Sequence, residues 1–302
     1  MNHSLPSVVE MKSPLYLILV SMRPKQWLKN GLVFVALLFS RNVFDSGMLA
    51  LSIGAFLVFC LLSSGVYIFN DLVDVERDRR HPLKAKRPLA SGRLSPLFAK
   101  IVLVFILAAS LTAAFFINLS FAAIALGYLI LQMGYSKLLK DLVIIDVFSI
   151  AAGFFLRVMA GAKAIDVPIS SWLLICTIFV SLFLGLGKRR HEILLMKEEA
   201  GNHRKVLNEY NLGLLDQMMS IVTAGTVISY SLYTLSPETI SKFRTENLWL
   251  TIPIVLYGVF RYLYVIYQKG KGGHPELVFF EDRHILASIL LYVFVVGLII
   301  YF

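Results

Sequence analysis

The chain has 302 residues, of which 58% are hydrophobic and only 16% are charged, and its mean hydropathy is +0.75. Soluble domains carry about 25% charged residues, so this composition excludes an ordinary water-soluble protein. Apolar stretches long enough to cross about 30 Å of hydrocarbon as helices recur along the whole length. We therefore expect an all-α integral membrane protein that forms one polytopic domain over residues 1–302.

The formal net charge is +10, but the basic residues are divided among short loops and have no interleaved aromatic residues. This pattern argues against nucleic acid and favours membrane lipids with anionic headgroups, or phosphorylated substrates. Cys60 and Cys176 lie inside apolar runs, with neither CxxC spacing nor a nearby His. They are predicted to be packed thiols.

The first 22 residues lack the apolar core and cleavage site of a secretory signal. The segment "SPLYLILVSM" is too short to span a bilayer, so residues 1–22 are predicted to be an interfacial lead-in. Nine membrane-spanning helices are predicted after it. Their centres lie near residues 37, 59, 106, 127, 152, 180, 224, 257 and 292.

The distribution of Lys and Arg predicts the orientation of these helices. Of the 29 basic residues, 22 fall before the first predicted span or in every second loop after it. The positive-inside rule places those segments in the cytoplasm, and an odd number of spans then places Phe302 on the other side. We expect a multi-pass protein of the plasma (inner) membrane, with its active site in a cavity that faces the cytoplasm.

The most polar loop is "NDLVDVERDRRHPLKAKRP", residues 70–88. If the second span continues as a helix through Asp78, then Asp71, Asp74 and Asp78 are spaced i, i+3, i+7 and share one stripe, with Asn70 beside it. Hard cations such as Mg²⁺ bind a few carboxylates together with substrate phosphate oxygens, so a Mg²⁺-diphosphate complex is the predicted occupant. The alternative is a solvated helix end.

In that alternative, the neighbouring Arg77, Arg79 and Arg80 would neutralise the three acids. Beyond them, Pro82 and Pro88 are predicted to end the helix, and Ser95-Pro96 to begin the next span. Lys84, Lys86 and Arg87 then lie in an irregular segment that can fold back over a bound anion. For each of these basic residues taken singly, the positive-inside rule of membrane topology is an equally good explanation.

These residues resemble the UbiA superfamily of intramembrane polyprenyl transferases. Asn70, Asp71, Asp74 and Asp78 reproduce its NDxxDxxxD motif, which implies a nine-helix bundle that binds Mg²⁺ and a diphosphate. Further elements resemble one branch, the decaprenyl-phosphate phosphoribosyltransferases that make arabinan precursors for the cell wall. These elements are "RPKQWLKN" (23–30), "DxxHPxKxxRPxASG" (78–92), "YSKLLK" (135–140), "RVMAG" (157–161), "GKRRHE" (187–192) and "GGHPELVFFEDR" (272–283).

The sequence departs from the wider superfamily after the sixth predicted span. Ordinary members carry a second Asp-rich motif there, whereas this chain has Lys188, Arg189 and Arg190. A second metal cluster is therefore not expected, and the site gains cations instead.

The resemblance to the branch implies transfer of phosphoribose from phosphoribosyl diphosphate (PRPP) to a polyprenyl phosphate, with release of diphosphate. It implies that Asp71, Asp74 and Asp78 are the catalytic metal ligands for Mg²⁺. Polar and basic groups from several spans would then bind the remaining parts of the substrates. The candidates are Lys29, Asn70, Lys84, Arg87, Tyr135, Lys140, Arg157, Lys188 and Arg189. The attacking phosphate is already ionised, so neither a general base nor a covalent enzyme intermediate is expected, and the anomeric carbon should be inverted.

Several alternatives stay open from the sequence. Arg157, costly in lipid, could bridge to a buried acid such as Asp146, and Lys188 to Arg190 could be anchors at the membrane surface. His81 and His274 are expected to have ordinary loop roles, and residues 272–283 are either a lid over the donor or a connecting loop. The rival functions are a prenyltransferase with a prenyl diphosphate donor and an aromatic acceptor, and a transporter whose acids bind a cation. The oligomeric state is also open, a homo-oligomer included.

Overall fold

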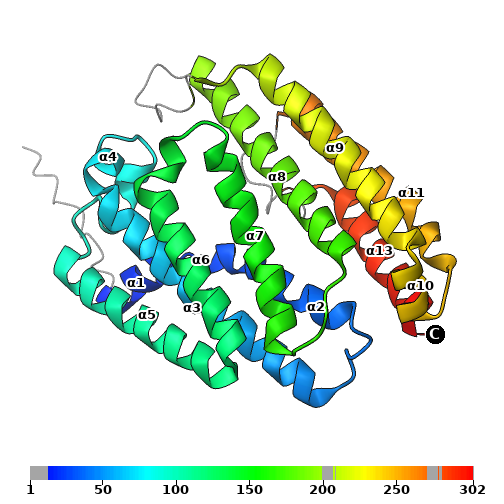
Figure 1. Cartoon of the computed structure of the whole chain (residues 1–302). Coiled ribbons are helices and arrows are strands. Elements are labelled where there is room, and N and C mark those ends of the chain that lie inside the picture. Colours follow the sequence, from blue (N-terminus) through cyan, green and yellow to red (C-terminus); the bar gives the residue numbers. More distant parts are fainter. Residues whose placement is uncertain (1–12, 199–206, 208, 271–277, 279–280, 302) are drawn as a thin grey trace, which may run out of the picture.

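The computed structural model describes residues 13–198, 207, 209–270, 278 and 281–301, all of them helical or connecting segments. Figure 1 shows one bundle of long helices. The elements are α1 (Pro14–Met22), the 3₁₀ helix η1 (Pro24–Phe34), α2 (Val35–Leu38), α3 (Ser46–Val73), α4 (Val75–Arg79), η2 (Lys84–Lys86), α5 (Pro96–Ile117), α6 (Leu119–Lys137), η3 (Leu139–Asp141), α7 (Ile145–Ala164), α8 (Ser171–Glu198), α9 (Leu212–Leu235), α10 (Pro237–Phe243), η5 (Asn247–Thr251), α11 (Ile252–Gln268) and α13 (Arg283–Tyr301).

Helix starts follow local sequence signals. Asp45, Asn118 and Asn211 each accept a hydrogen bond from the backbone N–H three residues later, at 2.8 Å, which satisfies a donor that the helix leaves unpaired. The expected start of α5 is confirmed, with Ser95 at the cap position and Pro96 as its first residue.

Eight helical segments of the described chain are long and apolar enough to cross a membrane: 46–73, 96–117, 119–137, 145–164, 171–195, 212–235, 247–268 and 283–301. Their outer faces carry large exposed apolar side chains, such as Phe105, Phe116 and Phe294. Exposed apolar surface on this scale suits lipid rather than water. The chain is thus a multi-pass membrane protein.

The expected first span is not among these eight segments, so the count of nine is not confirmed. The residues before and around its predicted centre, near residue 37, form η1 and the short α2 instead of one long helix, and α1 precedes them as a separate element. Arg23 adopts a left-handed backbone (φ 54°, ψ 63°) and Pro24 follows it. Because proline has no N–H and disfavours a helical residue before it, the helix ends here.

Helix α1 lies on α3. Leu17 and Ile18 are buried with Ile68 of α3, whereas Leu15 is exposed. Nine residues span only about 14 Å as an α-helix, too little to cross the bilayer. This agrees with the predicted lead-in over its described part, and residues 1–12 lie outside the described residues.

The bundle has two parts that are joined by packing of α7 against α8 (Figure 1). In the first, α3 packs against α5, α6 and α7, around a core that includes Phe59, Phe121 and Tyr128. In the second, α8 packs on α9 and α11 on α13. Helix α4, the α6–α7 connection and the facing ends of α8 and α9 lie at one end of the bundle, whereas α10 lies at the opposite end (Figure 1). The charged loops thus gather at one end, called here the charged end.

Candidate active site

The three aspartates of the motif lie at the junction of α3 and α4. Asp74 occupies the break between the two helices, yet its N–H still donates to the carbonyl of Asn70 (2.9 Å), and the N–H of Asp78 donates to that of Asp74 (2.8 Å). Helical hydrogen bonding therefore continues through the break. Asp71 and Asp78 are only 2% and 3% exposed, and both carboxylates contact Arg87. The expectation of a shared stripe is confirmed for these two.

Basic residues from three other segments pair with the acids. Arg87 Nη1 lies 3.1 Å from Asp71 and 2.5 Å from Asp78, and Arg23 also pairs with Asp71. Lys140 is buried and lies 2.7 Å from Asp74. Arg79, by contrast, pairs with the exposed Glu76. Neutralisation thus comes from distant segments, and the alternative that assigned it to the adjacent arginines is not supported for Arg79.

The loop after α4 folds back onto the end of α3, and its expected closure over a bound anion stays a prediction. Leu89 and Leu94 are buried there against Ile68, which holds Arg87 over the acids. Lys84 is half-buried in η2 and does not line the cavity described below. The ring Nδ1 of His81 accepts hydrogen bonds from the N–H groups of Leu83 and Lys84. His81 therefore has the loop role that was expected of it.

Two of the three aspartates lie close enough together to share a metal ion. No group of three or more His, Cys, Asp and Glu side chains in the described residues could by itself hold a metal ion. Asp71 and Asp78, however, lie close enough for a single Arg87 nitrogen to bridge them. Because Mg²⁺ in proteins often uses one or two carboxylates and takes its other ligands from substrate phosphates and water, this pair fits it, with Asp74 directly beside them.

A cavity of about 700 Å³ opens beside these acids. Its lining includes four basic residues, Arg23, Lys29, Arg157 and Lys188, together with Asn70 and Tyr135. No Asp or Glu belongs to this lining among the residues that the structure describes. The cavity thus suits an anion, and five of the predicted substrate-binding residues meet in it: Lys29, Asn70, Tyr135, Arg157 and Lys188.

One face of α8 forms a wall of the cavity along most of its length. The lining residues on α8 run from Lys188 to Leu173 at helical spacing, which corresponds to about 22 Å along the helix axis. The end near Lys188 is polar. The other end, near Leu173, is lined mainly by apolar and aromatic side chains, including Phe39, Cys176, Tyr233 and Val255.

Arg157 is buried in the wall of this cavity. Its Nε donates to Asn30 Oδ1 (2.8 Å), its Nη1 to the Gly153 carbonyl (2.8 Å) and its Nη2 to the Tyr128 hydroxyl (2.7 Å). All three acceptors are uncharged. The alternative of a bridge to Asp146 is not supported, because the carboxylate of Asp146 contacts Arg189 and Tyr210 instead.

The basic run on α8 is divided among three different environments. Lys188 lines the cavity. Arg189 is fully buried and contacts Asp146, Glu192 and the Tyr135 hydroxyl, so it supports the wall and does not line it. Arg190 pairs with Asp216 at 2.8 Å and stacks on Tyr267. Of the three, only Lys188 is placed to meet a ligand in the cavity.

A strained turn precedes α7 and is held by a residue that sequence reasoning missed, Tyr210. Ile144 has φ 69° and ψ −47°, and the N–H of Ile145 donates to the carbonyl of Val143 at 2.8 Å. This is the rare, strained γ-turn, and a β-branched residue makes it more costly. The Tyr210 hydroxyl accepts from the Ile144 N–H and donates to Asp146, both at 2.7 Å.

Burial, and then the hydrogen bond to Asp146, raise the pKa of Tyr210 well above its usual range. The hydroxyl therefore stays protonated and keeps both contacts. No motif in the sequence signalled Tyr210. Arg23 was missed as well. The signal that could have found it is its position directly before a proline, at the edge of an apolar stretch.

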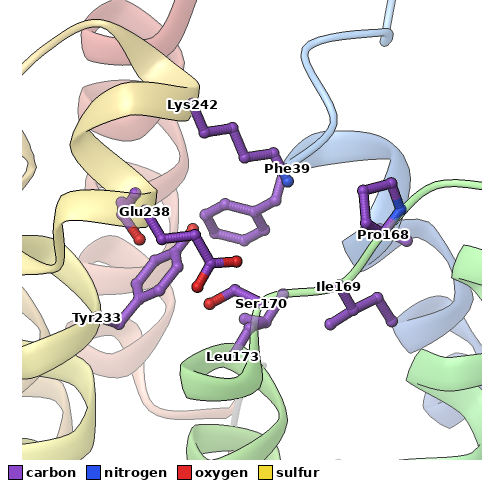
Figure 2. A pocket seen from close by; sticks show the side chains of 10 residues that line it. Phe39, Pro168, Ile169, Ser170, Leu173, Tyr233, Glu238 and Lys242 are labelled. Carbon is purple, nitrogen blue, oxygen red and sulfur yellow. The ribbon is translucent and has the colours of Figure 1, made fainter.

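A second, much smaller pocket of about 10 Å³ (Figure 2) is lined partly by α10, which lies at the opposite end of the bundle (Figure 1). Phe39, Leu173 and Tyr233 line both this pocket and the large cavity. Beyond them the lining of the small pocket is mixed, and it includes the charged Glu238 and Lys242. The three shared residues therefore lie between the apolar end of the cavity and a pocket that holds charged side chains.

Most of the segment 272–283, including His274, lies outside the described residues, so its expected role as a lid or a connection is left as a prediction. Asp282, at its end, contacts Arg261 and Lys269, both at 2.9 Å. The hydrogen bond from Arg261, followed by that from Lys269, holds the pKa of Asp282 well below its usual range.

Known proteins resemble this chain in sequence and in fold. A decaprenyl-phosphate phosphoribosyltransferase of Mycolicibacterium smegmatis is 31% identical over 295 residues, covering 94% of this chain and 92% of the relative. One of Corynebacterium glutamicum is 33% identical over 294 residues, covering 93% and 86%. A UbiA homologue from Archaeoglobus fulgidus, solved bound to GPP and Mg²⁺, superposes with a TM-score of 0.70 at 21% identity, covering 93% of this chain and 99% of that one.

The model of the UbiA prenyltransferase family matches residues 31–280. This match includes the acidic junction, the cavity-lining part of α8 and all predicted site residues except Lys29. The chain therefore belongs to the UbiA prenyltransferase family, as the resemblance predicted.

Proposed function

We propose that this chain transfers 5-phosphoribose from PRPP to decaprenyl phosphate or a similar polyprenyl phosphate and releases diphosphate. The observation that carries this proposal is the cavity lining of four basic residues beside a row of buried acids. PRPP carries a diphosphate and a separate phosphate, and the acceptor carries a third anionic group. The names of the relatives that match over nearly the full chain support the same reaction.

The acids at the α3–α4 junction would take the leaving diphosphate with Mg²⁺. Asp71 and Asp78 would hold the ion, with Asp74 beside them, and the fold is shared with a homologue bound to Mg²⁺. When bound, Mg²⁺ supplies Lewis-acid stabilisation of the charge on the departing diphosphate. Arg23 and Arg87 contact the same carboxylates, so both guanidiniums are close enough to turn to the diphosphate oxygens.

The remaining cations would position the groups that stay. Lys29 and Lys188, near the charged end of the cavity, are placed to bind the 5-phosphate of the donor by charge. An oxygen of the acceptor phosphate would then form a bond to the anomeric carbon, while the bond from that carbon to the diphosphate oxygen breaks and diphosphate departs with the electron pair. A single displacement inverts the carbon and needs no covalent intermediate on the protein.

We also propose that the charged end faces the cytoplasm in the plasma membrane, on the support of the distribution of Lys and Arg. The segment from Pro24 to Leu38, which is η1 followed by α2, would then be the ninth element to cross the membrane. A 3₁₀ helix rises about 2 Å per residue, so the 11 residues of η1 span about 22 Å before α2 begins.

The rival within enzymes is transfer of a prenyl chain from its diphosphate to an aromatic acceptor. The basic run Lys188–Arg190 on α8 argues against it, because ordinary members of the superfamily, which use a prenyl diphosphate donor, have a second Asp-rich motif at this place. Purified protein should be offered ¹⁴C-labelled PRPP with decaprenyl phosphate, and in parallel a prenyl diphosphate with hydroxybenzoate. We expect Mg²⁺-dependent lipid-linked label in the first assay only. Turnover in the second assay alone would reject the proposal.

A transporter is the rival from another class. Detergent-purified protein has no two compartments, so transport cannot release diphosphate from PRPP. Stoichiometric release of diphosphate with lipid-linked phosphoribose would therefore exclude transport as the explanation, whereas PRPP that remains intact under all conditions would favour it.

A further inference from the structure

We propose that the apolar half of the cavity, beginning at Arg157, is the subsite for the polyprenyl phosphate, with Arg157 as the ligand of its phosphate. This inference rests on the proposed function and assigns one of its two substrates to a defined part of the cavity. It leaves the donor to the polar half, beside the acids and Lys188.

Arg157 lies deep in the bundle, away from the charged end. It is twelve residues into α7 from Ile145, which corresponds to about 18 Å along the helix. Asn30, its partner, also donates to Ser63 of α3 at 3.1 Å. Ser63 lies seven residues before Asn70, about 10 Å further from the acid row. Arg157 is therefore separated by about two helical turns from the place where the diphosphate would bind.

The guanidinium of Arg157 donates hydrogen bonds to neutral groups. Three of the five N–H groups that a guanidinium offers donate to an amide oxygen, a carbonyl and a hydroxyl. The guanidinium also lies over the rings of Tyr128 (4.8 Å) and Phe154 (5.5 Å). These contacts fix its orientation without neutralising it. A buried cation of this kind at a cavity wall favours an anion in the cavity.

The lining beyond Arg157 is suited to hydrocarbon. Val180, Cys176 and Leu173 of α8 face it, together with Val255 of α11. Tyr230 and Tyr292 also line it, and their hydroxyls contact each other at 3.2 Å, while that of Tyr230 contacts Thr251 at 2.6 Å. The polar atoms of these tyrosines are thus paired among themselves, and their rings remain as apolar surface.

The two anionic groups of PRPP are both attached to a polar sugar. Only the acceptor carries its phosphate directly on a hydrocarbon chain. The anion next to the apolar half is therefore the acceptor phosphate, with the first isoprene units beyond it. Phe39, Leu173 and Tyr233 close this half, and Phe39 packs on Tyr233 edge to face (centroids 6.0 Å apart) before the small pocket begins (Figure 2).

Cys176 offers a direct test, because it lines the apolar half and the chain has only one other cysteine, Cys60. In a Cys60→Ala background, the rate at which N-ethylmaleimide labels Cys176 would be measured with geranylgeranyl phosphate and, separately, with PRPP and Mg²⁺. At about ten times its dissociation constant, geranylgeranyl phosphate should slow labelling about tenfold, whereas PRPP should leave the rate within about twofold. Protection by PRPP, or none by geranylgeranyl phosphate, would overturn the assignment.

Kinetics of two variants form a matched pair. Arg157→Lys keeps the charge but loses the planar fork, and should raise KM for polyprenyl phosphate about tenfold with little change in KM for PRPP. Lys188→Gln should raise KM for PRPP, with little change in KM for polyprenyl phosphate. If Arg157→Lys raises KM for PRPP instead, the subsite is assigned to the wrong substrate.

A third variant covers the case in which Arg157→Lys does not fold. Val180→Phe narrows the apolar half without touching a charge, and should lower kcat/KM for the acceptor while KM for PRPP is unchanged. An unchanged kcat/KM for the acceptor would contradict the assignment. Failure of the wild-type protein to transfer phosphoribose at all would instead reject the proposed function, whatever the labelling of Cys176 shows.

Discussion

The end of α3 and the end of α8 lie at the same end of the bundle and carry opposite charges. At the end of α3, buried acids are neutralised by Arg23, Arg87 and Lys140, which come from other segments. On α8, the buried Arg189 is neutralised by Asp146 of α7 and by Glu192 one turn later. Both ends thus hold charges inside the protein, but their paired cations differ in position: Arg23, which pairs with Asp71, lines the cavity, whereas Arg189 does not.

This difference separates residues that can bind a ligand from residues that stabilise the fold. The cations that pair with Asp71 are partly exposed, with Arg23 and Arg87 both at 28% side-chain exposure, so a ligand can reach them and compete for them. The Arg189–Asp146 pair has no exposed side-chain surface on either partner. We therefore expect substitutions at the end of α3 to remove activity, and substitutions around Arg189 to remove stability.

The largest effect is expected for Asp71→Asn. It removes one of the two carboxylates that share Arg87, and the metal contribution that depends on them is worth several kcal/mol, so transfer should fall by on the order of 10³-fold. The measurement is transfer of label from PRPP to lipid under saturating Mg²⁺. Asp216→Asn, at a pair remote from the acids, is the control and should stay near wild type. Full activity of Asp71→Asn would contradict the assignment of Asp71 as a metal ligand.

Arg189→Gln should have the largest effect on stability. It leaves Asp146 charged and buried without its partner, which costs about 3–5 kcal/mol for a buried pair. Arg190→Gln breaks the partly exposed pair with Asp216 and should cost under about 1 kcal/mol. Thermal unfolding of the two detergent-solubilised variants gives the comparison, and equal midpoints would contradict the supporting role of Arg189.

A smaller loss of stability is expected for Gly161→Ala. A Cβ at this position would lie 2.0 Å from the carbonyl oxygen of Val33, so η1 must move away from α7. Such overpacking costs about 1–3 kcal/mol, and it should also raise KM for PRPP because Lys29 lies on η1. Gly127→Ala has no atom within 4 Å of its new Cβ and serves as the control. A Gly161→Ala protein as stable and active as that control would show that η1 can shift freely.

A loss of stability of about the same size is expected for Tyr210→Phe, which leaves the Ile144 N–H and one Asp146 oxygen without this hydroxyl partner, at a cost of about 1–3 kcal/mol. A pH profile distinguishes this role. Because folding raises the pKa of Tyr210, its contribution is complete below the unfolded value of about 10 and is lost as the pH rises towards the folded value. Wild type should therefore lose stability above about pH 10 more steeply than Tyr210→Phe. Parallel profiles would contradict this role.

Most of the acidic junction could be predicted from the sequence, because the positions of Asp71 and Asp78 depend on helical periodicity within one segment. Two cations of the cavity were found for other reasons: Arg157 because an arginine is costly in lipid unless it faces an interior, and Lys188 because a basic run stands where ordinary superfamily members have a second Asp-rich motif. Family membership was also predicted correctly from the motifs.

Pairing between distant segments was beyond sequence reasoning. Arg189 was predicted to bind substrate, but packing of α7 against α8 places it against Asp146 and outside the cavity lining. The 3₁₀ helix η1 was also missed, because the apolar run around residue 37 favours one continuous membrane-spanning helix.

The division of the site into a donor end beside the acids and an acceptor end beyond Arg157 can be observed most directly in a structure determined with Mg²⁺ and PRPP. We predict density for the diphosphate beside Asp71 and Asp78, with the 5-phosphate near Lys188 and the apolar half free of the sugar. Density for the diphosphate at Arg157, or for PRPP outside the cavity, would contradict the division.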